Sequence, residues 1–458
     1  MENELIVGLD IGTTKIACFV GQRAASGKVK ILGFGKTESV GVEHGVVRSI
    51  TLTAESITKA VNIAADQANV DIEEVYVGIA GQHIKSRPSQ GSITIPAEHV
   101  LIEEEDVQRL TADQYNILLE PGEEIIHIFP QQYVVDRVPL SRDITPVGVP
   151  GKTLVGNFHM VTANKQNLQN IRYAVEHAGL RIKGVVLEPV ASAKAVLDEG
   201  DRDAGVAMVD IGGGTTDIAI FHDGIIRHTS VLPLAGNAIT NDVREGCNVL
   251  KRQAESLKVK FGSCLTSAVS DKDVISIPGI RSQAPREIYV KTLAGIIHAR
   301  TKMIMEQVDY EIKLSGFDKK LLAGVVLTGG GAQLKNIKDL CALITATDTR
   351  IGIPNEHLES DSVAFAELAH PMYATGIGLV LYGIEQSEAG CKHCNTEKKE
   401  NKSAHTDIFK DMDEIEESQT APEPTPEVKE QPKKKQKGKS FDDVIGGYLK
   451  NLFNENIE

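Results

Sequence analysis

Two glycine-rich segments carry the residue types that bind phosphate. The first reads Asp10-Ile11-Gly12-Thr13-Thr14-Lys15, and the second reads Asp210-Ile211-Gly212-Gly213-Gly214-Thr215-Thr216-Asp217. Glycine lets backbone N–H groups approach an anion closely, and the hydroxyl groups and Lys15 add further donors. Each segment lies between two apolar runs of strand length, which predicts two similar β-hairpins. A tight turn without a ligand is the alternative, because such turns also need glycine.

The residues that follow both loops separate this pattern from the familiar nucleotide motifs. In P-loop and dinucleotide-binding folds the glycine loop opens a helix. Here residues 15–20 and 216–221 are mostly apolar or β-branched, and neither loop ends in Gly-Lys-Ser/Thr. The sequence therefore favours two phosphate-binding hairpins that face each other.

Acidic residues at these loops imply a cation. Asp10 and Asp210 end their apolar runs, and Asp217 follows the second loop. Carboxylates repel a phosphate unless a cation lies between them, and Mg²⁺ held through water is the natural choice. We predict that these three residues hold Mg²⁺ through water. The alternative is that they only cap turns.

A third glycine run, Gly329-Gly330-Gly331, follows the apolar residues 325–327. From residue 332 on, apolar residues recur at helical spacing, which predicts that this run opens a helix. Three glycines also remove side chains where a base or a ribose could lie against the backbone. The run is therefore a candidate nucleoside site.

The three motifs, in this order, resemble those of the actin, Hsp70 and sugar-kinase superfamily of ATP-binding proteins. The resemblance covers roughly residues 5–385 and includes two connecting segments, 186–193 and 374–378. It implies an α/β actin-like ATPase fold, with two related halves around a cleft that binds ATP and Mg²⁺. It further implies that Glu188 helps to order Mg²⁺ or the attacking water, and that Glu255 and Lys258 lie near the ribose. We expect weak ATP hydrolysis at most, because the motifs place no separate general base at the terminal phosphate.

Within that superfamily the chain resembles the FtsA family of bacterial cell-division proteins. Residues 84–163 resemble the subdomain that is specific to that family, no large peptide-binding domain follows the second half, and a linker leads to an amphipathic end. The resemblance implies a peripheral protein on the cytoplasmic side of the inner membrane, at the division site. There it would self-associate, meet other division proteins and anchor the FtsZ ring. A small-molecule kinase is the alternative function; an Hsp70-like chaperone is disfavoured by the missing peptide-binding domain.

The predicted organisation has four subdomains and a tail. The large subdomain of the first half comprises residues 1–83, 164–203 and 371–386, and residues 84–163 form a subdomain that is inserted into it. The large subdomain of the second half comprises residues 204–246 and 308–370. The small subdomain of the second half comprises residues 247–307. A disordered linker follows at 387–440, because this stretch has almost no large apolar residues. By resemblance, the small subdomain of the second half binds the C-terminal peptide of FtsZ. Its candidate contacts are the basic residues Arg286, Lys291, Arg300 and Lys302, for which a solvated helix face is the alternative.

The last 18 residues predict an amphipathic helix at 441–455. Its apolar residues form one stripe: Phe441, Val444, Ile445, Tyr448, Leu449, Leu452 and Phe453. Such a helix is about 20 Å long, too short to cross a hydrocarbon core of about 30 Å, so it would lie in the membrane interface. Five lysines at 433–439 would favour an anionic surface. The alternative is a helix that docks on a protein partner.

Composition narrows the function classes. Lys and Arg total 49 against 63 Asp and Glu, a net charge of −14, which disfavours nucleic acid as a partner. Four cysteines lie singly in apolar stretches, which predicts buried, reduced thiols and a cytoplasmic protein: Cys18, Cys247, Cys264 and Cys341. Cys391 and Cys394 form a lone Cys-x-x-Cys pair without a second pair, so we favour no metal there, with zinc or redox chemistry as the alternative.

Overall fold

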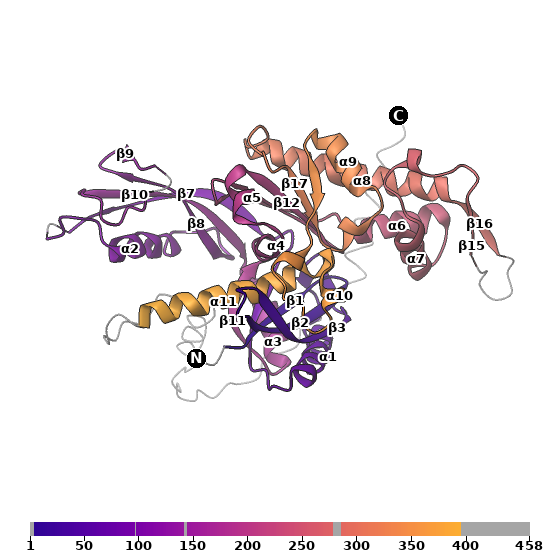
Figure 1. The fold of residues 1–458 in the computed structure, drawn as a ribbon, viewed down its shortest axis with the longest axis horizontal. Coiled ribbons are helices and arrows are strands. Elements are labelled where there is room, and N and C mark those ends of the chain that lie inside the picture. Colours follow the sequence, from indigo (N-terminus) through magenta and orange to yellow (C-terminus); the bar gives the residue numbers. More distant parts are fainter. Residues whose placement is uncertain (1–3, 97, 142–143, 278–284, 395–458) are drawn as a thin grey trace, which may run out of the picture. The chain divides into compact units, whose positions relative to one another are not determined.

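The computed structural model describes residues 4–96, 98–141, 144–277 and 285–394 (Figure 1). The predicted amphipathic helix at 441–455 and most of the predicted linker lie outside the described residues, as do the side chains of Cys391 and Cys394. Among the described helices, none is both long enough and apolar enough to span a membrane. The four other cysteines are buried and free.

The first half is built on a five-stranded sheet in the order β11-β6-β1-β2-β3. Its strands are β1 (Ile6–Ile11), β2 (Lys15–Arg23), β3 (Val29–Glu38), β6 (Glu74–Ile79) and β11 (Arg181–Leu187). The first three form an antiparallel meander, and β6 and β11 add to it in parallel. Helix α1 (Ile50–Ala68) packs on β2 and β3, and α11 (Ala374–Cys394) packs on β1 and β2. Every residue of β1 is buried.

The second half repeats this topology. Its sheet has the order β14-β13-β12-β17-β18, with an antiparallel meander of three strands followed by two parallel ones. The strands are β12 (Val206–Ile211), β13 (Thr216–His222), β14 (Ile225–Leu232), β17 (Val325–Thr328) and β18 (Thr349–Ile351). The prediction of two related halves, each beginning with a hairpin, is therefore confirmed.

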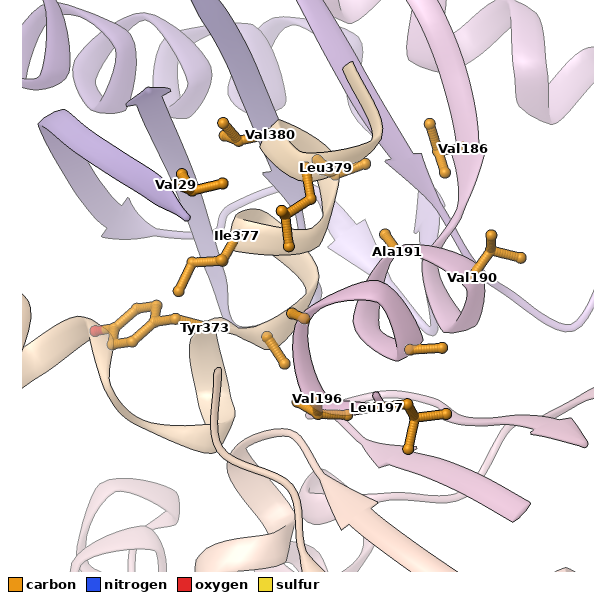
Figure 2. Packing of buried hydrophobic residues seen from close by; sticks show 14 of the residues in the cluster. Val29, Val186, Val190, Ala191, Val196, Leu197, Tyr373, Ile377, Leu379 and Val380 are labelled. Atoms are coloured by element: carbon orange, nitrogen blue, oxygen red, sulfur yellow. The ribbon is translucent and has the colours of Figure 1, made fainter. Parts of the chain in front are cut away.

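Two helices from the connecting segments cross each other closely. These are α4 (Glu188–Val196) and α11, and Figure 2 shows Val190 and Ala191 of α4 near Ile377 and Leu379 of α11. A Cβ atom on Gly378 would lie only 1.8 Å from the carbonyl oxygen of Ala191. The crossing therefore requires glycine at this position. It brings the beginnings of both helices close to the second sheet.

Residues 85–164 form a separate small layer of sheet and helix. Its antiparallel sheet has the order β7-β10-β8-β9, from β7 (Lys85–Thr94), β8 (Glu123–Val135), β9 (Val138–Pro139) and β10 (Thr153–Asn164). Helix α2 (Glu104–Tyr115) packs on this sheet, and it begins where the Asp106 carboxylate accepts the backbone N–H of Glu103. Leu110, Phe158 and Met160 form the core between them. This layer corresponds to the predicted insertion.

The remaining helices complete the two halves. Helix α3 (Lys165–His177) packs on α1 and β11, α5 (Glu199–Ala204) packs on β13 of the second sheet, and α10 (Phe365–Leu368) precedes α11. In the second half, α6 (Gly236–Cys247), α7 (Lys251–Phe261) and α8 (Val290–Leu314) pack together beside the hairpin of β15 (Val274–Ile277) and β16 (Arg286–Tyr289), and α9 (Ile337–Thr345) packs on α8. The short 3₁₀ turns are η1 (Thr266–Ala268), η2 (Gly330–Gln333), η3 (Pro354–Glu356) and η4 (Pro371–Tyr373).

The end of the folded body differs from the sequence-based boundary. The linker is predicted from residue 387, whereas α11 continues to Cys394. Polar contacts hold this last part of the helix to the body, because Glu385 pairs with Lys194 and Glu388 pairs with Arg23. A polar composition alone therefore set the boundary too early.

Candidate functional site

The two phosphate-type loops meet face to face. Gly12–Thr14 joins β1 to β2, and the loop at 212–215 joins β12 to β13, as the hairpin prediction requires. A Cβ atom on Gly213 would lie 2.3 Å from the Cγ2 atom of Thr14, and one on Gly214 would lie 2.5 Å from the Oγ1 atom of Thr13. The glycines of the second loop therefore allow the two threonines of the first to lie against its backbone.

The carbonyl groups of the second loop are held in place one after another. The carbonyl oxygen of Gly212 accepts the N–H of Gly236 at 3.1 Å, and that of Gly213 accepts the N–H of Asn237 at 2.8 Å. The carbonyl oxygen of Gly214 accepts the Nδ1–H of His44 at 3.1 Å. In a trans peptide the N–H points opposite to the carbonyl. The next N–H groups, of Gly213, Gly214 and Thr215, thus each point away from the donor that holds the preceding carbonyl. We call these three N–H groups the anion-binding nest, because successive backbone donors of this kind can bind an anion.

The aspartates that precede the two loops have different surroundings. Asp10 forms an ion pair of 2.6 Å with Lys15 of its own hairpin. Asp210 instead accepts a hydrogen bond of 2.6 Å from the Ser192 hydroxyl and one of 3.2 Å from that of Thr375. Ser192 lies on α4 and Thr375 on α11, so both connecting helices hold this carboxylate. Sequence reasoning found both segments but missed the two hydroxyls.

Asp217 and Glu188 add two more carboxyl groups to the same place. The Oδ1 atom of Asp217 is buried without a hydrogen-bond partner, and burial together with Asp210 raises the pKa of Asp217 to about 8. Burial and the three aspartates also raise the pKa of Glu188 well above its ordinary value. Burial opposes the charge of Lys15, but the neighbouring carboxylates outweigh it and raise the pKa of the amine.

This cluster fits a cation that the carboxylates meet through its water ligands. Glu188 interacts with the three aspartates and with Lys15, and one buried carboxyl oxygen, of Asp217, is unpaired. Over the residues that the structure describes, no group of three or more His, Cys, Asp or Glu side chains is arranged to hold a metal ion directly. Mg²⁺ commonly keeps several of its waters in such sites.

Glu255 and Lys258, predicted near a ribose, lie on α7 beside the second loop. The Lys258 ammonium is buried and donates to the carbonyl of Gly236 at 3.1 Å and to the hydroxyl of Thr240 at 2.9 Å. It also pairs with the half-exposed Glu255 at 2.9 Å. Because Gly236 itself binds the loop at Gly212, Lys258 ties the small subdomain to the phosphate loop.

The third glycine run departs from the sequence-based reasoning in two ways. It opens only the 3₁₀ turn η2, and the α-helix begins later, at Ile337, after a left-handed residue at Asn336. A Cβ atom on Gly329 would lie 2.2 Å from Asp210 Oδ1, and one on Gly331 would lie 2.4 Å from Ile211. These two glycines therefore allow close packing on the end of β12. Only at Gly330 is there space for a ligand, since the nearest atoms are those of Met372 at 3.9 Å.

A cavity of about 690 Å³ lies next to this run. Its walls come from η2, the beginning of α9 and the residues that follow β18 or precede η4. They include Ala332, Gln333, Leu334, Ile353, His370 and Pro371. The cavity is large enough for a nucleobase.

The four basic candidates each have a partner within the chain. Arg286 donates to the carbonyl of Asn248, Lys291 pairs with Asp271, Arg300 forms a two-pronged pair with Asp242 at 2.6 and 2.9 Å, and Lys302 lies 3.8 Å from Glu306. Arg286 lies on β16 and Lys291 at the beginning of α8. Arg300 and Lys302 lie about 14 and about 17 Å further along the same helix. The structure therefore does not gather them into one tight cluster.

Two family models and two relatives indicate the same family. Family models match at residues 207–378 ("Cell division protein FtsA"), 81–162 ("SHS2 domain inserted in FTSA") and 163–230 ("Hsp70 protein"). The cell division protein FtsA of Pseudomonas aeruginosa is 35% identical over 84% of this chain and 91% of its own length. That of Neisseria meningitidis is 37% identical over 81% and 88%. A chain of a solved PilM-PilN type IV pilus biogenesis complex shares the fold, with a TM-score of 0.58 at 16% identity over 83% of this chain and 98% of that one.

Proposed function

The chain belongs to the FtsA family of cell division proteins, and we propose that it binds ATP with Mg²⁺, self-associates on the cytoplasmic face of the cell membrane and anchors the FtsZ ring there. The match of the inserted layer to the family's own domain favours this role over the small-molecule kinase of the same superfamily. Other division proteins would be further partners at the division site on the membrane.

The observation that carries nucleotide binding is the row of held carbonyls at residues 212–214. The opposite N–H groups would bind the terminal phosphate, and Thr13, Thr14 and Lys15 of the facing loop would bind the phosphates nearer the nucleoside. Asp10, Asp210 and Asp217 would hold Mg²⁺ through water, which neutralises charge between carboxylates and phosphates.

Glu188 is the candidate for orienting the attacking water. A general base must be ionised to accept a proton, and burial beside three aspartates raises the pKa of Glu188. A cation bound beside it would lower this pKa and favour the ionised form that a base needs, and we propose weak hydrolysis at most. The nucleotide would then act mainly by holding the two halves in one relative position.

The nucleoside end would lie between α7 and the third glycine run. Glu255 and Lys258 would approach the ribose, and the base would lie against Gly330 in the adjoining cavity. Gly330→Ala tests this placement cleanly, because the added methyl group meets only ordinary contacts in the protein. Gly295→Ala on α8 is the matched control, since its Cβ would meet nothing within 4 Å.

Binding of a fluorescent ATP analogue in the presence of Mg²⁺ measures both variants. We expect Gly330→Ala to weaken binding about tenfold, as when a close ligand contact is lost, and Gly295→Ala to bind within about twofold of the unmodified chain. Equal affinity of the unmodified chain and of both variants would contradict the placement of the nucleoside at the third glycine run. A chain that binds no nucleotide at all would refute the nucleotide site.

The proposed FtsZ contact is testable on α8. Lys302→Glu reverses one of the four candidate charges, and Lys313→Glu is a matched control, because each lysine pairs with an acid one turn away on the same helix. We expect the first to weaken binding of the acidic FtsZ C-terminal peptide about tenfold and the second to leave it unchanged. A loss of equal size in both would indicate a general effect of charge.

Membrane attachment is proposed for residues 441–455. Vesicle flotation of the full chain and of a chain that ends at residue 440 tests it, with neutral vesicles and with vesicles that contain anionic lipid. We expect only the full chain to float, and more strongly with anionic lipid. Equal flotation of both chains would contradict this anchor.

A further inference from the structure

A short hairpin from the first half reaches the second phosphate loop. It consists of β4 (Val42–Glu43) and β5 (Val46–Val47), with His44 and Gly45 at its tip. Both tip residues have positive φ angles, 48° and 73°, which suits a tight two-residue turn. The turn directs the His44 ring and the Gly45 backbone toward the loops, and the sequence-based search did not single out either residue.

The tip contacts three functional segments at once. His44 Nδ1 donates to the carbonyl of Gly214 at 3.1 Å, and the N–H of Gly45 donates to the hydroxyl of Thr13 at 3.1 Å. A Cβ atom on Gly45 would lie 2.9 Å from the carbonyl oxygen of Ala80 and 3.0 Å from Gly81 Cα. Residues 80–84 lead from β6 into the inserted layer. One turn thus joins both phosphate loops to the base of the insertion.

The carbonyl partner fixes the chemistry of the His44 ring. A carbonyl oxygen only accepts, so the proton must reside on Nδ1. This hydrogen bond orients the peptide between Gly214 and Thr215, and hence directs the Thr215 N–H to the opposite side. His44 therefore positions the third donor of the anion-binding nest without touching the anion itself.

His44 differs from the other two groups that hold the loop. Gly236 and Asn237 belong to the second half and move together with the loop, whereas His44 belongs to the first half. If the two halves separate, the bonds from Gly236 and Asn237 persist and only the bond from His44 breaks. The third donor is therefore set in place only when the two halves are close.

We propose that His44 is the positioning residue through which this site distinguishes a nucleoside triphosphate from a diphosphate, and that the tip transmits the difference to the inserted layer through residues 80–81. The inference rests on the proposed nucleotide binding. A terminal phosphate in the nest gains the Thr215 donor only when His44 is bound, whereas a diphosphate held by the first loop does not need it. By linkage, a triphosphate must then stabilise the His44 contact by the same factor by which that contact favours the triphosphate, and Gly45, which packs on Ala80, belongs to the same tip.

Three variants of the full chain test this. His44→Ala removes the donor. His44→Asn keeps an N–H donor close to the position of Nδ1 and a residue type that tolerates positive φ. Glu43→Ala is the matched control in the same hairpin, because its side chain is 72% exposed and pairs only loosely with Arg48, at 3.9 Å. Thermal unfolding verifies that each variant is folded.

The first measurement is the ratio of affinities for a non-hydrolysable ATP analogue and for ADP, both with Mg²⁺. We expect His44→Ala to lower the preference for the triphosphate about fivefold, the effect of one ordinary hydrogen bond, with ADP affinity within about twofold of the unmodified chain. His44→Asn should recover most of the preference, and Glu43→Ala should retain all of it. An equal loss for both nucleotides, or no loss for either, would overturn the assignment.

The second measurement is hydrogen exchange of residues 80–84 with each nucleotide. We expect the triphosphate to slow exchange there in the unmodified chain and in His44→Asn, and this slowing to vanish in His44→Ala. Slowing that persists in His44→Ala would overturn the transmission through the tip. If the unmodified chain bound neither nucleotide, the proposed function would fail first, so the two failures are distinguishable.

Discussion

Gly378→Ala is the substitution whose cost the structure defines most sharply. The new Cβ atom would lie 1.8 Å from the carbonyl oxygen of Ala191, whereas ordinary contact begins at 3.4 Å. The shortfall of 1.6 Å lies between two helix backbones, so no side-chain rotation relieves it. Overpacking of this kind costs about 3 kcal/mol, and the better helix propensity of Ala recovers about 1 kcal/mol. We therefore expect the free energy of unfolding to fall by about 2 kcal/mol.

The same separation should reach the site, because Ser192 on α4 and Thr375 on α11 both bind Asp210. Loss of one hydrogen bond to a buried carboxylate costs about 1.5 kcal/mol or more, which corresponds to roughly tenfold weaker nucleotide binding. Thermal unfolding with and without nucleotide measures both effects, and Gly295→Ala is the control for a glycine replacement in a helix. A Gly378→Ala chain that melts and binds like the unmodified chain would refute this account of the helix crossing.

Three further outcomes follow from individual contacts. Gly213→Ala should weaken nucleotide binding about tenfold, since its Cβ would lie 2.3 Å from Thr14 Cγ2, and the added change Thr14→Ser, which removes that methyl group, should restore part of it. Removal of Mg²⁺ by a chelator should abolish nucleotide binding, and an excess of Mg²⁺ should restore it. Burial lowers the pKa of His127 and of His159 to about 4, and the charge of His228 contributes to the lowering at His159. Between pH 6.5 and pH 4 the unfolded chain therefore binds more protons than the folded chain. The free energy of unfolding should therefore decrease as the pH falls through this window, by about 2 kcal/mol at pH 5 for the buried His159 alone. Denaturant unfolding at pH 7 and pH 5 measures the decrease, and His159→Gln should make it smaller.

The sequence predicts well what is encoded over short stretches of chain. Each phosphate-type loop lies between two runs of strand length, so both hairpins, and the similarity of the two halves, follow from local patterns. The insertion is also recognisable, because residues 84–163 resemble the subdomain specific to the family and a domain model matches at 81–162. The site residues in the loops were predicted by type, and their roles toward a nucleotide stay predictions.

Contacts between distant segments could not be predicted in this way. His44 and Gly214 are 170 positions apart, and Ser192 and Thr375 are 183 apart; no local pattern relates such residues, since only the closed fold brings them together. The third glycine run illustrates the same limit. Gly329 and Gly331 have the residue type expected at a ligand, but they are required by close packing on Asp210 and Ile211. Residue type alone does not distinguish these two causes.

The arrangement of charge explains why the two loops differ although their sequences are alike. At the first loop, Lys15 pairs directly with Asp10, so that hairpin carries little net charge. At the second, Asp210 is held only by neutral hydroxyls, and Asp217 has an unpaired buried oxygen. Carboxyl groups therefore gather on the side of the second loop, and their burial beside one another raises the pKa of Asp217 and of Glu188. A terminal phosphate would raise these pKa values further, whereas a divalent cation would lower them and offset the repulsion between carboxylates and phosphate. The charge balance therefore supports the proposed Mg²⁺ at the second loop more than at the first, which has its own lysine.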